Sequence, residues 1–339
     1  MNYPALQTLF YAFENELLAA PSGDVLFINA QDHDYLKTID HLTLEQHFAP
    51  YAKDLMQKGY DVQSHQTDVK KFDAVLLLGT KNVQETRFHI CRALEALKDG
   101  GLLVCAAAND AGGKRLGKDL KTLGLEIEDI SKHKCRVVWA HKTNDVNADV
   151  LDQWQSQGDV QGILDGAFKS QPGLFSWDRA DKGSQFLLDY LATENISKKG
   201  ADFGCGYGFL SKNILQMKEF VTALDYIDAD SRAVKVCEEN IKGFNAEIRG
   251  VWHDLTQKVP NDPAYNFILM NPPFHEGKKT AAEIGQAFIR NAYLALKRGG
   301  VLYMVANAHL PYEKIVAAQF KKFDIIEEKQ GFKIIKAVR

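Results

Sequence analysis

The sequence contains few cysteines, no long hydrophobic run and no excess of charge of either sign. Its five cysteines form no Cys-x-x-Cys pair, which argues against a disulfide scaffold and a cysteine zinc site and favours a reducing compartment. The N-terminus lacks the basic and then apolar pattern of a signal peptide. No stretch approaches the ~18 apolar residues that a membrane span requires. We therefore expect a cytoplasmic protein with no metal site and no membrane contact.

The balance of charges also excludes a broad surface for a polyanion. Lysine and arginine number 41 against 44 aspartates and glutamates, and 45% of the residues are hydrophobic, as in an ordinary globular protein. Residues 1–145 carry 17 basic against 20 acidic residues, and residues 146–339 carry 24 of each. An anionic ligand must therefore be met by a small local patch. A length of 339 residues suggests about two domains.

The two halves of the sequence repeat one pattern of elements. In each half a buried strand is followed by an amphipathic helix and by Lys-x-Gly-Gly, and the half ends in a late strand of antiparallel type. These elements span residues 72–79, 83–97, 98–101 and 131–141 in the first half, and 265–271, 282–296, 297–300 and 329–339 in the second. Hydrophobic strands and Gly-Gly turns are common in α/β proteins, but here order and spacing also agree, which favours a duplication. We predict an α/β protein with two tandem domains, each a mainly parallel sheet with helices on both faces and a late antiparallel strand.

A polar segment separates the two predicted domains. Residues 144–162 are rich in Asp, Gln and Asn, a composition typical of a connector. The predicted organisation is an N-terminal domain over residues 1–145, a connector over 146–171 and a C-terminal domain over 172–339.

A glycine-rich loop in the second half is the sharpest local signal. Gly204, Gly206 and Gly208 follow a short strand and precede a helix over residues 210–217, so a ligand can approach the backbone at the carboxyl end of the strand. The spacing is G-x-G-x-G and not the G-x-G-x-x-G of a dinucleotide cradle, which favours an adenosyl-amino-acid ligand. With Asp202 and Cys205, these glycines are our candidates for binding that ligand. The matching loop of the first half, residues 26–32, has no glycine, so we expect no such cofactor there.

Acidic residues follow the next two predicted strands. Asp225 and Asp228 both lie about 20 residues beyond the loop, where a carboxylate can accept the two ribose hydroxyls of a nucleoside. We favour Asp228, because the helix that starts after it places the end of the strand there, and we assign Asp230 the structural role of helix cap. Asp254, after the third strand, is placed to accept a hydrogen bond from an adenine amino group.

The fourth strand ends in Asn271-Pro272-Pro273-Phe274. Two prolines end the hydrogen-bond ladder of a strand and stiffen the chain. Elsewhere in a sequence, we would interpret such a motif as a simple turn. At the end of the fourth strand it suits methylation of a planar NH2 group. The side-chain oxygen of Asn271 and the carbonyl of Pro272 can accept both N–H protons, and Phe274 can stack on the base. Positioning then provides most of the catalysis, and no strong general base is needed.

These motifs resemble a known family. The C-terminal half is similar to class I S-adenosylmethionine-dependent methyltransferases of the Asn-Pro-Pro-Phe/Tyr type, and within them to the bacterial ribosomal RNA guanine-N2 methyltransferases, above all those of the small subunit. The segments that carry the resemblance are residues 172–176, 181–184, 202–208, 271–277, 306–312 and 331–333. The sequence departs from the family pattern at the extra acids Asp225 and Asp230 and at His309, where an apolar aromatic is usual.

The resemblance implies two tandem class I, Rossmann-like methyltransferase domains, of which the N-terminal copy is degenerate. It implies transfer of a methyl group from S-adenosylmethionine to the N2 amine of a guanine in small-subunit (16S) rRNA. It places Gly204, Gly206, Gly208, Asp228 and Asp254 at the cofactor, and Asn271 and Phe274 at the guanine, with Asn271 also next to the cofactor. Alternatives are a guanine of large-subunit rRNA, a protein glutamine amide, a non-catalytic RNA-binding or ribosome-assembly factor, and a nicotinamide dehydrogenase.

The target guanine must leave its stack to enter such a site. Phe175, His275, Lys278 and Lys279 are our candidates for contacting it or the neighbouring phosphates, although surface lysines are commonly only solvated and an aromatic residue is more often packed. We expect the partner to be small-subunit rRNA in the assembled or assembling 30S subunit, and we expect the chain to be a monomer.

Overall fold

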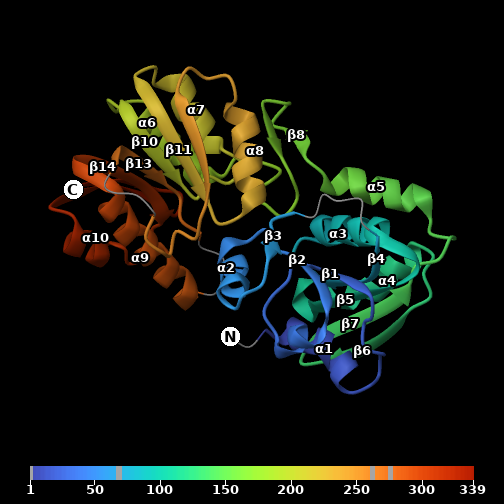
Figure 1. The fold of residues 1–339 in the computed structure, drawn as a ribbon. Helices are drawn as coiled ribbons and strands as arrows, with labels where there is room; N and C mark the ends of the chain where they lie inside the picture. Colours follow the sequence, from blue (N-terminus) through green and yellow to red (C-terminus); the bar gives the residue numbers. More distant parts are fainter. Residues whose placement is uncertain (1–2, 66–70, 260–263, 274–277) are drawn as a thin grey trace. The chain divides into compact units, whose positions relative to one another are not determined.

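The computed structural model describes residues 3–65, 71–259, 264–273 and 278–339, with side chains from residue 282 onward in the last range. The chain divides into two compact units. The first comprises Met1–Val160 with Gln171–Gly173, and the second comprises Gln161–Ser170 with Leu174–Arg339. Each unit contains a seven-stranded sheet with flanking helices (Figure 1). No helix among the described residues is long and apolar enough to cross a bilayer.

The first unit contains the elements α1 (Pro4–Glu14), β1 (Asp24–Ile28), β2 (His41–Glu45), α2 (Ala49–Gln57), β3 (Val62–Gln63), β4 (Phe72–Leu78), α3 (Val83–Ala96), β5 (Leu97–Ala108), α4 (Gly113–Thr122), β6 (Glu128–Lys132), β7 (Cys135–His141) and α5 (Ala148–Gly158), with short 3-10 turns at Asp34–Thr38 and Asn109–Ala111.

The second unit begins with the hairpin β8 (Gln161–Ile163) and β9 (Phe168–Ser170). It continues with α6 (Lys182–Leu191), β10 (Lys198–Phe203), α7 (Phe209–Met217), β11 (Val221–Asp228), α8 (Ser231–Ile241), β12 (Glu247–Trp252), β13 (Tyr265–Met270), α9 (Lys278–Ala295), β14 (Leu296–Asn307), α10 (Glu313–Gln319), β15 (Lys322–Lys329) and β16 (Phe332–Val338).

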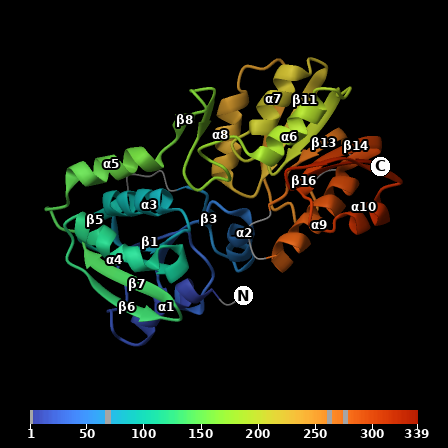
Figure 2. The same ribbon diagram turned by 180° about the vertical axis from the view of Figure 1, so that it is seen from behind.

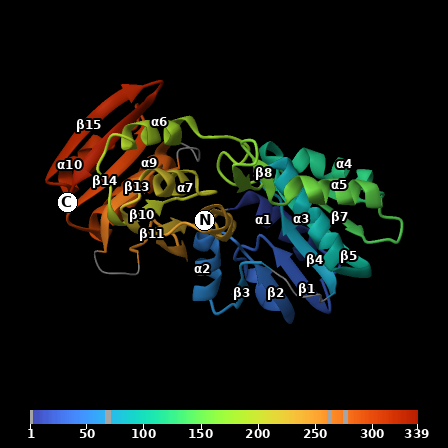
Figure 3. The same ribbon diagram turned by 90° about the horizontal axis from the view of Figure 1, so that it is seen from above.

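The two sheets have the same strand order. It is β3-β2-β1-β4-β5-β7-β6 in the first unit and β12-β11-β10-β13-β14-β16-β15 in the second. In both, the first five strands are parallel, and the last strand in sequence inserts antiparallel between the fifth strand and the edge. Figure 3 shows β15 at the outer edge of the second sheet. The predicted fold class, two mainly parallel sheets each with a late antiparallel strand, is confirmed.

The repeated Gly-Gly pairs share one physical cause. Gly100 and Gly299 both have φ of +77°, which a residue with a side chain adopts only with strain. A Cβ at Gly101 would lie 2.9 Å from the carbonyl oxygen of Lys98, and a Cβ at Gly300 would lie 2.9 Å from that of Lys297. The same turn thus starts the fifth strand of both sheets, which agrees with a duplication.

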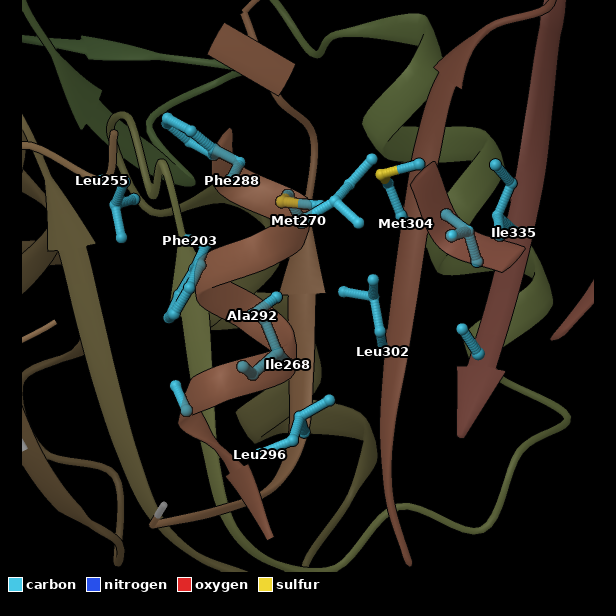
Figure 4. Close-up of a cluster of buried hydrophobic side chains, with 14 of the residues drawn as sticks. Phe203, Leu255, Ile268, Met270, Phe288, Ala292, Leu296, Leu302, Met304 and Ile335 are labelled. Atoms are coloured by element: carbon cyan, nitrogen blue, oxygen red, sulfur yellow. The ribbon is translucent and has the colours of Figure 1, made fainter. Parts of the chain in front are cut away.

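The second sheet is covered on both faces. Alternate residues of β13 point to opposite sides, so Ile268 and Met270 lie in one core and Phe267 and Leu269 in the other. Helices α9 and α10 cover the first face, and α6, α7 and α8 cover the second (Figure 2). Figure 4 shows the first core, in which Phe203 and Met270 are the last residues of β10 and β13. These buried ends hold the loops at the carboxyl edge of the sheet.

The segment expected to be a connector contains regular structure. Helix α5 packs on α3, with Trp154 5% exposed and the Arg87 guanidinium 4.3 Å from the centre of its ring. The hairpin β8–β9 is joined to α8 by Asn240, which accepts a hydrogen bond from the N–H of Lys169 and donates one to its carbonyl oxygen. A helix that buries so few apolar side chains has a weak hydrophobic pattern, which explains why composition suggested only a linker.

Candidate active site

The glycine loop follows β10 at the carboxyl edge of the second sheet. Gly204, Gly206 and Gly208 have φ of +78°, +53° and +89°, a region that favours glycine. A Cβ at Gly208 would lie 2.7 Å from Sγ of Cys237 on α8, whereas a Cβ at Gly206 would meet no described heavy atom within 4 Å. Gly208 is therefore needed for close packing of α8, and Gly206 leaves open space beside the loop.

Asp228 is the acid that the structure places beside this loop. It ends β11, and its Oδ2 accepts a hydrogen bond of 2.9 Å from the N–H of Gly206. Burial raises the pKa of Asp228 to about 6. Asp225 lies earlier in β11, where its buried carboxylate forms an ion pair with Arg249 and accepts a 2.6 Å hydrogen bond from the hydroxyl of Tyr265. Asp225 therefore serves the interior of the unit and does not reach the glycine loop.

The helix after β11 begins as predicted. Asp230 is the N-cap of α8, and its carboxylate accepts a hydrogen bond of 2.9 Å from the N–H of Arg232. The structural role expected for this acid is confirmed.

Asp202 is a buried carboxylate with unused acceptor capacity. Its Oδ2 accepts a 2.7 Å hydrogen bond from the hydroxyl of Ser211, and its Oδ1 is buried without a hydrogen-bond partner among the described residues. Burial, helped by the nearby Asp228, raises the pKa of Asp202 to about 7. Such a group is poised to accept a hydrogen bond from a cationic ligand.

The side chain of Cys205 packs in the core beneath the α6, α7 and α8 face of the sheet. It is 5% exposed, and burial and the thiol of Cys237 raise its pKa well above the usual range. The side chain is therefore a neutral thiol at physiological pH.

Asp254 lies two residues beyond the end of β12. Its Oδ1 accepts hydrogen bonds from the N–H and the hydroxyl of Thr256, at 2.8 and 2.7 Å. The carboxylate thereby stabilises the turn that follows the strand, at the same sheet edge as the glycine loop.

Asn271 presents its side-chain oxygen at this edge. It follows Met270, which pairs with Phe203 of β10, so Asn271 and the glycine loop extend from neighbouring parallel strands. Its Nδ2 donates to Oδ2 of Asp181 and to Oγ of Ser184, each at 2.8 Å. Its Oδ1 is buried and has no hydrogen-bond partner among the described residues.

The structure describes only some of the remaining predicted site residues. Pro272 is buried next to Asn271. Phe175 is 42% exposed in the loop before α6. Lys278 and Lys279 begin α9, but their side chains are outside the described residues, as are Phe274 and His275. Within the part of the chain described here, no group of three or more His, Cys, Asp or Glu side chains could hold a metal ion.

The structure adds polar residues at the carboxyl edge of the sheet that the sequence did not single out. Asp181 and Ser184 entered the prediction only within a motif, since they lie 90 and 87 residues from Asn271. Lys333 is 1% exposed, and its Nζ donates to the carbonyl oxygens of Ala308 and Leu310 at 3.0 and 2.7 Å. It anchors the loop after β14, and in the sequence it belongs to the segment 331–333 that carries the resemblance.

Fold and site together define an α/β methyltransferase. The model of the methyltransferase small domain family matches residues 165–336, and that of the methyltransferase small domain N-terminal family matches residues 16–157. The chain belongs to the methyltransferase small domain family.

The chain is similar to named ribosomal RNA methyltransferases and to a solved structure. The ribosomal RNA small subunit methyltransferase C of Shewanella baltica is 28% identical over 322 residues, which cover 89% of this chain and 88% of the relative. That of Psychromonas ingrahamii is 29% identical over 274 residues, covering 79% and 76%. The structure of a T. thermophilus 16S rRNA N2 methyltransferase, RsmC, in complex with AdoMet and guanosine has a TM-score of 0.83 at 20% identity, covering 100% of this chain and 92% of that one. This structural likeness agrees with the tandem fold.

Proposed function

We propose that this enzyme transfers a methyl group from S-adenosylmethionine to the exocyclic N2 amine of a guanine in small-subunit rRNA. The observation that carries the proposal is the buried Oδ1 of Asn271, an acceptor with no partner among the described residues, next to the glycine loop. The names of the curated relatives support small-subunit rRNA as the substrate class.

The residues present fit S-adenosylmethionine. Open space beside Gly206 admits a ligand to the backbone, and the buried Oδ1 of Asp202 can accept a hydrogen bond from an ammonium group. Asp228 is held beside the loop, where it suits ribose hydroxyls, and Asp254 is our candidate for the adenine amine. Cys205 and Gly204 complete the wall of this cofactor site, and the choice of Asp228 over Asp225 rests on the buried ion pair of Asp225.

Asn271 and Pro272 act on the nucleophile. When bound, S-adenosylmethionine supplies an electrophilic methyl group on a sulfonium. Oδ1 of Asn271 accepts one N–H of the guanine amine, the carbonyl oxygen of Pro272 accepts the other, and Phe274 stacks on the base. The amine would thereby be oriented with its lone pair toward that methyl group. Transfer would form the N–C bond and leave the electron pair of the S–C bond on sulfur. The nitrogen then releases a proton to water. Orientation and preorganised acceptors account for the rate.

The two units have different proposed roles. Residues 1–145 form a degenerate copy without a cofactor site, residues 146–171 connect it, and residues 172–339 form the catalytic domain. Phe175, His275, Lys278 and Lys279 contact the flipped base and its flanking phosphates. The enzyme acts as a monomer in the cytoplasm on the assembled or assembling 30S subunit.

A methylation assay tests the proposal. The purified chain is incubated with isotope-labelled S-adenosylmethionine and, in separate reactions, with 30S subunits, free 16S rRNA and free 23S rRNA, and the nucleosides are analysed by mass spectrometry. The expected product is N2-methylguanosine in 16S rRNA, which is also lost from cells without the gene. Product confined to 23S rRNA would favour a large-subunit enzyme. Absence of both methylation and cofactor binding would favour a non-catalytic assembly factor.

A further inference from the structure

We propose that Asp181 and Ser184 are positioning residues that hold the carboxamide of Asn271 in one orientation, with Oδ1 presented to the target amine. This inference rests on the proposed function of Asn271 and names two residues that act through it. We call the pair, with its two hydrogen bonds to Nδ2, the amide clamp.

The chemistry of the partners determines which way the amide points. An ionised carboxylate has no hydrogen to donate, so the Asn271 atom that faces Oδ2 of Asp181 at 2.8 Å must be the NH2 nitrogen. The second hydrogen of that nitrogen is taken by Oγ of Ser184, also at 2.8 Å. Both donors of the amide are therefore used inside the protein, and the buried Oδ1 keeps its acceptor capacity for a ligand.

The reversed amide would be unproductive on both sides. Its oxygen would face the carboxylate of Asp181, and its NH2 group would face the N–H donors of the guanine amine. Two acceptors or two donors in contact repel each other, and a buried polar group without a partner is costly. The negative charge of Asp181 also polarises the amide toward its oxygen, which strengthens Oδ1 as an acceptor for an amine that becomes positive during methyl transfer.

The start of helix α6 fixes the clamp in place. Asp181 is the N-cap of α6, and its Oδ2 also accepts a 2.8 Å hydrogen bond from the N–H of Ser184. Ser184 is 6% exposed. A Cβ at Gly183 would lie 3.0 Å from the ring of Phe332 and 3.1 Å from Oδ2 of Asp181. One carboxylate oxygen thus links the helix start to the amide, and the packing around Gly183 leaves little room for either to shift.

Steady-state kinetics on variants tests the clamp. We expect kcat to fall about 100-fold in Asp181→Ala and about tenfold in Ser184→Ala, because a preorganised hydrogen bond near the reacting group is weakened. Asp181→Asn keeps a capping oxygen but removes the charge, so we expect an intermediate loss, about tenfold. KM for the RNA and Kd for S-adenosylmethionine should stay within about twofold. Ser184→Thr, which restores the hydroxyl, should recover most of the activity.

A double-mutant cycle separates positioning from general damage. Added to Asn271→Ala, the Asp181→Ala change should cost no further activity, because the clamp acts only through Asn271. Asn147→Ala, which removes an N-cap from α5, is the matched control. It should lower stability by a comparable amount, about 1 kcal/mol, with kcat unchanged.

Two outcomes would overturn the inference. One is an Asp181→Ala/Ser184→Ala protein with kcat within about twofold of wild type while Asn271→Ala has lost about 100-fold or more, which would leave the proposed function intact. The other is full additivity in the cycle. If Asp181→Ala does not fold, the same two comparisons are made with Ser184→Ala and Asp181→Asn: kcat relative to wild type, and additivity with Asn271→Ala. An active Asn271→Ala protein would instead refute the role proposed for Asn271 itself.

Discussion

The two sheets share a strand order, yet their carboxyl edges are filled differently. In the second unit Phe203 pairs with Met270, and Gly204 comes next; in the first unit Ile28 pairs with Leu77, and Asn29 comes next. Asn29 keeps the left-handed backbone of its glycine counterpart, with φ of +58°. Its Nδ2 donates a buried 2.9 Å hydrogen bond to the carbonyl oxygen of the residue after Leu77. The side chain of Asn29 therefore connects the ends of β1 and β4, whereas Gly204, its counterpart in the second unit, has no side chain to do so.

The acid of the second strand shows the same contrast. Asp228 follows the residue that pairs with Phe203, and Gln46 stands in the equivalent place in the first unit. Asp228 accepts a hydrogen bond from the loop, whereas Gln46 donates a 2.7 Å hydrogen bond to the carbonyl oxygen of Ala30 and accepts one of 2.8 Å from the N–H of Phe48. One topology thus supports either an edge where Asp228 holds a glycine loop or an edge where the amides of Asn29 and Gln46 bond to neighbouring carbonyl oxygens. Local residues, and not the sheet, decide between them. A buried side-chain oxygen without a partner among the described residues occurs at both edges, on Asn271 and on Asn29.

Removing the amide at the second edge should have the largest effect. We expect Asn271→Ala to lower kcat by about 100- to 1,000-fold, the loss typical for one preorganised hydrogen bond in a catalytic site. Calorimetry should show cofactor affinity largely unchanged. Asn29→Ala, at the edge of the first unit, is the control and should reduce stability without lowering kcat. Equal activity of wild type and Asn271→Ala would remove the main functional distinction between the units.

Two glycine substitutions should distinguish a glycine that makes room for the cofactor, Gly206, from one that is needed for packing, Gly208. Gly208→Ala puts a methyl group against Sγ of Cys237 and strains the backbone, so we expect a loss of about 2–3 kcal/mol in the free energy of unfolding. Gly206→Ala has room for the methyl group, so it should cost only about 1 kcal/mol of backbone strain but weaken cofactor binding severalfold. Denaturant unfolding and calorimetry measure the two effects. If both variants lost stability equally and bound cofactor normally, the space at Gly206 would have another use.

Cofactor binding should strengthen as pH rises. With a pKa of about 7, Asp202 is largely protonated at low pH in the folded chain. The folded state then holds more protons than the unfolded state between its usual pKa and 7, so ionisation on raising the pH lowers the stability of the free protein. A cationic ligand favours the ionised form. We expect Kd for the cofactor to be about tenfold higher near pH 5.5 than near pH 8. In Asp202→Asn, Kd should change less with pH, and the remaining change should be due to Asp228. An unchanged pH dependence of Kd would contradict the assignment of Asp202 to the cationic ligand.

Opening the first edge should have the smallest effect. Asn29→Gly removes a buried hydrogen bond but also removes the strain of a left-handed asparagine, so we expect stability to fall by about 1 kcal/mol or less. Calorimetry should still show one cofactor per chain, because Gln46 continues to tie the loop to its neighbour. A second bound cofactor in this variant would show that Asn29 alone closes the first unit.

Much of the fold could be predicted because its signals are local. The repeat led to two mainly parallel sheets, each with a late antiparallel strand, and Asp230 as a cap followed from its position after a strand. The predicted helix 83–97 closely matches α3, whereas α9 begins at Lys278 and not at the expected residue 282. Its first turn is Lys-Lys-Thr-Ala, which lacks the large apolar side chains that mark a helix. The cofactor and substrate residues remain predictions.

The sequence by itself determined the two-unit architecture, the glycine loop and the presence of an Asn-Pro-Pro-Phe motif in one unit only. These features depend on periodicity, backbone freedom and proline, all of which act over a few residues. Only the tertiary structure decided that Asp225 is taken up by Arg249 while Asp228 meets the loop, and that Asp181 and Ser184 orient Asn271. Hydrogen-bond partners far apart in the chain are chosen by the register of neighbouring strands and by helix packing, which no local pattern encodes.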